Sequence, residues 1–69
     1  MDAALRMLLI ATVLENKTGK TGAALAKYIE ITELHPKTSE AKDAAKQIIK
    51  IKKAFPNATP NFDEASLYN

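Results

Sequence analysis

Three stretches of the chain place apolar residues at a spacing of three or four, which is the period of an amphipathic helix. They cover residues 2–17, about 20–35 and about 38–55. We therefore expect an all-α fold of three helices.

Capping residues mark where these helices begin. Asp2 stands at the N-cap position of the first helix, and Thr21 can cap the second through its hydroxyl group. Thr38 or Ser39 can cap the third, followed by Glu40 at the positive end of the helix dipole.

Glycine and proline mark where the helices end. Gly19 suits the left-handed turn after the first helix. Pro36 and Pro56 stop the second and third helices because proline lacks an amide hydrogen.

The expected inner faces follow from the same spacing. On the second helix the inner face comprises Ala24, Leu25, Tyr28, Ile31 and Leu34, and the outer face carries Lys20, Lys27, Glu30 and Glu33. On the third helix the inner face comprises Ala41, Ala44, Ala45, Ile48, Ile51 and Phe55.

The first helix is apolar around most of its circumference. Such a helix needs cover on more than one side, and two short neighbours leave part of it uncovered. We expect the uncovered part, with the face around Tyr28, to bind a protein partner or a second copy, most simply as a homodimer. The candidate partner-binding residues are Leu5, Leu8, Leu9, Val13 and Tyr28.

Composition argues against catalysis and metal binding. The chain of 69 residues has no cysteine and one histidine, so it offers no disulfide framework and no metal site. We also expect no cofactor. Gly19-Lys20-Thr21 matches the end of a phosphate-binding loop, but Leu14 stands where that loop needs its first glycine. His35 has no obvious nucleophile or second metal ligand to act with and is expected to be a solvated helix-end residue. We expect no enzyme.

The third helix supports a rival interpretation as an anion-binding surface. Four of its lysines share one side, and they could follow a phosphate backbone or another anionic surface. Asp43 interrupts the series and no aromatic residue is interleaved, so nucleic acid is the less favoured partner. These lysines are Lys42, Lys46, Lys50 and Lys53.

Each end of the chain carries apolar residues that allow a second interpretation. The apolar run at 7–14 resembles a signal-peptide core, but Asp2 and Glu15 flank it where basic and small residues belong, and it is too short to span a bilayer. Residues 57–69 are expected to form an extended or flexible tail with at most a helical turn near 63–67. The tail could also dock through Phe62, Leu67 and Tyr68 on its own or a neighbouring molecule.

The stretch 19–36, GKTGAALAKYIEITELHP, resembles the second half of a tetratricopeptide repeat (TPR). Gly19 matches the turn glycine, and Ala24, Tyr28 and Pro36 hold the spacing of that pattern. The sequence of this stretch is most similar to repeats of bacterial cell-envelope proteins. The resemblance implies that residues 1–56 form a TPR-like hairpin plus a capping helix, acting as a scaffold that binds protein without catalysis.

Overall fold

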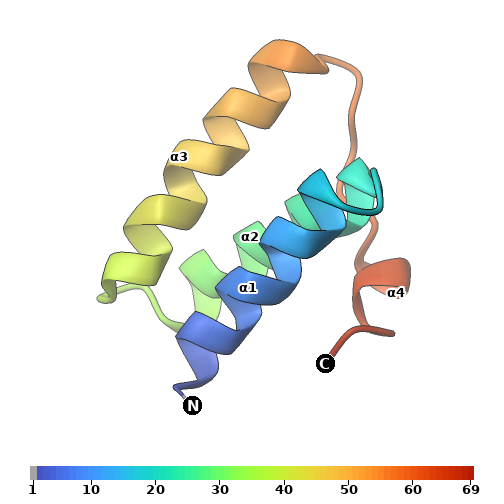
Figure 1. Cartoon of the computed structure of the whole chain (residues 1–69). Helices are drawn as coiled ribbons and strands as arrows, with labels where there is room; N and C mark the ends of the chain where they lie inside the picture. Colours follow the sequence, from blue (N-terminus) through green and yellow to red (C-terminus); the bar gives the residue numbers. More distant parts are fainter. Residues whose placement is uncertain (1) are drawn as a thin grey trace.

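The computed structural model describes residues 2–69, and this part of the chain is all-α (Figure 1). Three long helices confirm the predicted fold class. The helices are α1 (Ala3–Asn16), α2 (Thr21–Leu34), α3 (Ser39–Ala54) and the short α4 (Phe62–Ala65).

Local signals in the sequence explain most helix ends. The Asp2 side chain accepts a hydrogen bond from the Ala4 amide at 2.8 Å, and Thr38 Oγ1 accepts one from the Ala41 amide at 3.1 Å. Gly19 has a φ of +67°, which is the left-handed conformation expected of it. The predicted Thr21 cap is wrong, because Thr21 is already the first helical residue and no side chain caps that end.

Helix α2 lies at the centre of the fold and contacts each of the other three helices. Its residues 23–26 are completely buried and include three alanines, whose small side chains let neighbours approach from several directions. Figure 1 shows α1 in front of α2, while α3 diverges from α1 toward its C-terminal end. The hairpin α1–α2 is thus covered by α3 on one side.

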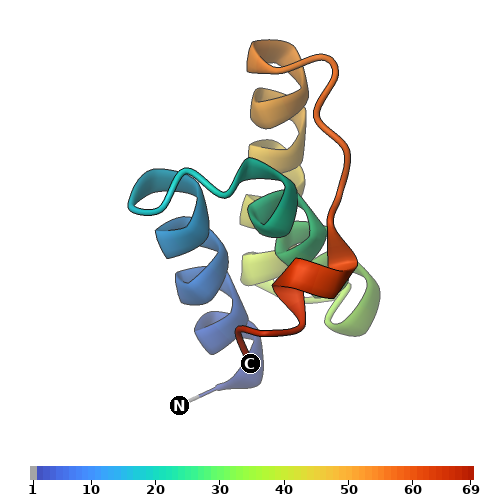
Figure 2. The same cartoon turned by 90° about the vertical axis from the view of Figure 1, so that its right-hand side faces the viewer.

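The C-terminal segment packs on α2. Figure 2 shows it descending from α3 past the start of α2 to α4. The Asn61 amide donates a hydrogen bond to the Gly22 carbonyl at 2.9 Å, and Ala65 is fully buried. Gly22 permits this approach, since a Cβ atom there would lie 3.0 Å from the carbonyl oxygen of Thr59. The helical turn expected near 63–67 is α4, which begins one residue earlier.

Several predicted inner-face residues are exposed. Leu34 is the last residue of α2 and Phe55 is the C-cap of α3, so both lie where a helix ends, and Ala45 is exposed within α3. The remaining predicted inner-face residues of α2 are buried, and those of α3 are buried or partly buried against the core.

Candidate functional site

The outward side of α1 carries an uncovered row of apolar side chains. Ala4, Ala11 and Leu14 turn inward and are buried. Leu5 and Leu9 therefore lie on the opposite, outward side of the helix. We call the row the α1 stripe. It consists of Leu5, Leu9 and Val13, which are 38%, 48% and 49% exposed.

An apolar groove runs beside the α1 stripe. It has a volume of about 370 Å³ and lies between α1 and the C-terminal residues Tyr68 and Asn69. Leu9 and Val13 belong to both the stripe and the groove. The groove wall made by Tyr68 is held in part by Lys20, whose Nζ lies 5.7 Å from the centre of the Tyr68 ring. The C-terminal segment therefore widens the apolar surface of α1.

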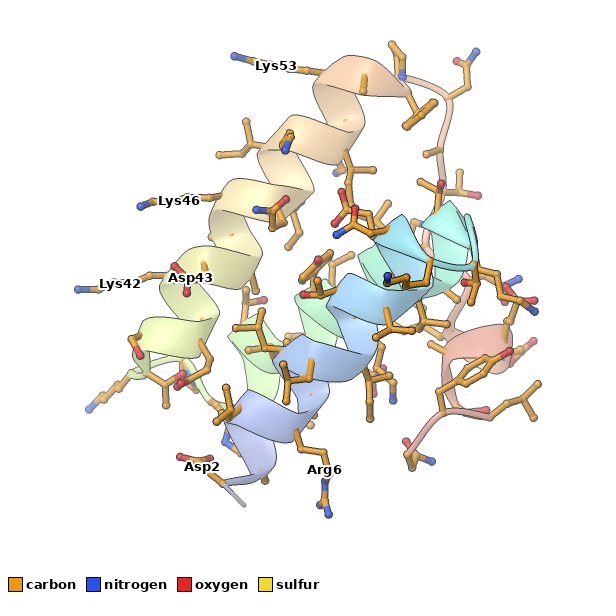
Figure 3. All side chains as sticks on the ribbon, in the orientation of Figure 1. Asp2, Arg6, Lys42, Asp43, Lys46 and Lys53 are labelled. Carbon is orange, nitrogen blue, oxygen red and sulfur yellow. The ribbon has the colours of Figure 1, made fainter. Side chains whose placement is uncertain are left out.

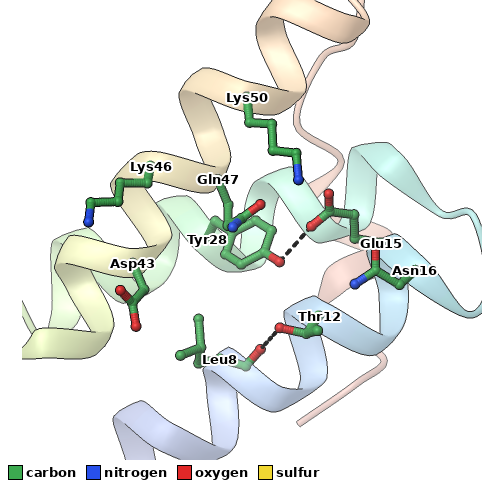
Figure 4. Close-up of a pocket in the computed structure, with 9 residues that line it drawn as sticks. All are labelled: Leu8, Thr12, Glu15, Asn16, Tyr28, Asp43, Lys46, Gln47 and Lys50. Atoms are coloured by element: carbon green, nitrogen blue, oxygen red, sulfur yellow. Dashed lines mark hydrogen bonds between the residues drawn. The ribbon is translucent and has the colours of Figure 1, made fainter.

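On the edge of the α1 stripe away from the groove, α1 borders a polar cleft shared with α3. Figure 4 shows this cleft of about 290 Å³, with Tyr28 of α2 at its floor. The Tyr28 hydroxyl donates a hydrogen bond of 2.7 Å to Glu15 Oε1. Burial and then this hydrogen bond raise the pKa of Tyr28 to about 12. Glu15 is thereby occupied in a structural contact.

Charges of both signs surround the cleft. Asp43, Lys46 and Lys50 come from α3, and Figure 4 shows the Lys50 amine directed toward Glu15. Among residues 2–69, no group of three histidine, cysteine, aspartate or glutamate side chains could hold a metal ion.

The structure brings together only part of the predicted partner-binding set. Leu5, Leu9 and Val13 form one row, but Leu8 turns toward the cleft with α3. The face around Tyr28 stays a predicted partner surface, although the Tyr28 side chain itself is only 1% exposed. Its position on the central helix, between α1 and α3, places the ring in the core and leaves the hydroxyl at the cleft floor.

The four lysines predicted as an anion-binding series are all exposed on α3. Figure 3 shows Lys42, Lys46 and Lys53 extending away from the rest of the fold. Across residues 2–69, none of the four forms a salt bridge.

The helical period does not reveal one buried contact of a charged side chain. Lys27 was placed on the outer face of the second helix, but it is only 2% exposed. Its Nζ donates a hydrogen bond to Asn69 Oδ1 at 2.9 Å and lies 3.9 Å from Glu30 Oε1. The C-terminal segment covers this position, and nothing in the helical period of residues 20–35 reveals that cover.

No protein-family model, curated protein or solved structure matches this chain. Within residues 2–69, no helix has the length and apolar character needed to cross a membrane.

Proposed function

We propose that this chain is a non-catalytic protein-interaction or assembly module that associates with a second copy of itself through the α1 stripe. One observation carries the proposal. From Met7 to Leu14 the helix has no charged residue, and its outward side presents three large apolar side chains that are each 38–49% exposed. An exposed apolar row that continues into an apolar groove is typical of a protein-binding surface.

The apolar surface that the α1 stripe can bury sets the strength of this association. Complete burial of a leucine or valine contributes about 1.5–3 kcal/mol, so covering a half-exposed one contributes roughly 1 kcal/mol. Two copies bring six such side chains, for roughly 6 kcal/mol before the loss of translational and rotational freedom is subtracted. Contacts at the groove must add to this value. Association costs at least about 4 kcal/mol, so the six side chains alone leave about 2 kcal/mol. Groove contacts that supply about 2–4 kcal/mol more would give a weak dimer with a Kd on the order of 0.1–1 mM, which is the value we expect.

The resemblance to tetratricopeptide repeats supports the same class of function. Two of the positions that carry it, Ala24 and Tyr28, are buried where α2 packs against its neighbours. A helical hairpin followed by a third helix is also the arrangement that one repeat and the start of the next would make. The family assignment, the bacterial source and the scaffold role remain part of the proposal.

Sedimentation equilibrium tests the self-association. The wild-type chain should show a rising mean mass up to about 1 mM, and Leu9→Lys should remain monomeric because a charge would be buried at the centre of the contact. Ile49→Lys is the matched control, since Ile49 is 59% exposed on α3 and outside the stripe. A monomeric wild-type chain, or equal loss of association in both variants, would contradict the proposal.

The exposed lysines of α3 favour a second candidate, the binding of an anionic surface or nucleic acid. Their lack of intramolecular salt bridges within residues 2–69 leaves their charge available. Binding of this kind weakens steeply as salt rises, because each neutralised phosphate releases counterions. Replacing Lys42, Lys46, Lys50 and Lys53 with glutamine should abolish it, whereas association through the α1 stripe should persist in high salt.

A further inference from the structure

We propose that the two copies pack their α1 helices antiparallel, about a two-fold axis that passes next to Leu9. This inference rests on the proposed self-association and adds its geometry. The α1 stripe is symmetric in sequence about Leu9, since Leu5 and Val13 each lie four residues away. A two-fold interface must be complementary to itself, which a row with a central residue satisfies.

The antiparallel arrangement produces a defined set of contacts. Leu9 lies beside Leu9 of the partner subunit at the axis. Leu5 lies against Val13 of the partner subunit, and the two-fold axis repeats this contact. Each contact between Leu5 and Val13 joins a larger and a smaller side chain. Because Val13 lines the apolar groove of about 370 Å³, the partner's Leu5 enters at the groove, which extends the contact beyond the helix.

The charges at the ends of α1 favour this direction over a parallel one. Asp2 caps the N-terminus and Lys17 follows the C-terminus, and both are exposed. Antiparallel copies place Asp2 near Lys17 of the partner subunit at both ends and also oppose the helix dipoles. Parallel copies would instead bring together like charges at Asp2, Arg6 and Lys17.

Single cysteines distinguish these directions, because the chain has no cysteine of its own. Facing positions on packed helices fall within the Cα separation of about 4.4–6.8 Å that a disulfide needs. Three variants are oxidised separately near 0.5 mM, a concentration chosen for a Kd of order 0.1–1 mM. They are Leu5→Cys, Leu9→Cys and Val13→Cys, with Ile49→Cys as the exposed control.

The antiparallel arrangement predicts a distinct pattern of crosslinks. Leu9→Cys should form a disulfide-linked dimer at least tenfold faster than the control. Leu5→Cys and Val13→Cys should each react at the control rate alone, and an equal mixture of the two should give mainly the mixed disulfide.

The opposite results separate this inference from the proposed function. If Leu5→Cys and Val13→Cys each crosslink as fast as Leu9→Cys, the helices are parallel and the arrangement is wrong. If all three react at the control rate while sedimentation shows a wild-type dimer, self-association stands but the α1 contact is refuted. A monomeric wild-type chain in sedimentation would refute both.

Discussion

The buried amine of Lys27 offers the sharpest test of how the C-terminal segment holds the fold. Its hydrogen-bond acceptor is Asn69 Oδ1 at 2.9 Å, and Glu30 Oε1 lies farther away at 3.9 Å. Asn69→Ala removes the nearer partner and leaves an ammonium group that is almost out of contact with water. We expect this single change to destabilise the protein.

The magnitude follows from the chemistry of the contact. A hydrogen bond to a charged group contributes about 1.5–3 kcal/mol, and an unsatisfied buried donor costs a similar amount. The C-terminal segment can move aside and admit water, which lowers the loss to about 1–2 kcal/mol. Lys27→Met should be nearly neutral, because an apolar side chain of similar length fills the space without needing a partner.

Urea unfolding followed by circular dichroism measures these changes. With an m value near 1 kcal/mol/M for a small protein, Asn69→Ala should lower the unfolding midpoint by about 1–2 M. The double variant Lys27→Met/Asn69→Ala should regain most of that loss, since no buried charge remains to be satisfied. If Asn69→Ala has the same effect in both backgrounds, the contact between these two residues does not explain the stability.

Two other substitutions test the cleft floor and the close approach at α2. Tyr28→Phe removes the 2.7 Å hydrogen bond to Glu15 and should cost about 1 kcal/mol. Because folding raises the pKa of Tyr28 from 10.0 to about 12, the stability advantage of the wild type over Tyr28→Phe should be full below pH 10, shrink above it and change sign before pH 12. A difference in unfolding free energy that stays constant from pH 8 to 12 would contradict this account. Gly22→Ala should gain helix propensity of up to about 1 kcal/mol but push the Thr59 backbone away, so residues 56–61 should be cleaved faster in limited proteolysis. An unchanged cleavage rate would show that the segment adjusts without leaving α2.

Local rules in the sequence determined the helical framework. The Asp2 cap, the left-handed Gly19 and the stop at Pro36 act over a few residues, so their effect follows from neighbours in the chain. The excess apolar surface of the first helix was also predictable, because it depends on residue type around one helix. Leu5, Leu9 and Val13 in the α1 stripe came from this reasoning.

The tertiary structure decided which faces are covered. Helical period alone placed Lys27 outside and Tyr28 on a binding surface, yet both are buried, because helix α2 is covered on several sides. Residues 57–69 carry no regular pattern, and Gly22 admits them to α2 through one missing Cβ atom. Contacts between residues more than 35 positions apart, such as Lys27 with Asn69, depend on how helices pack, which no local spacing encodes.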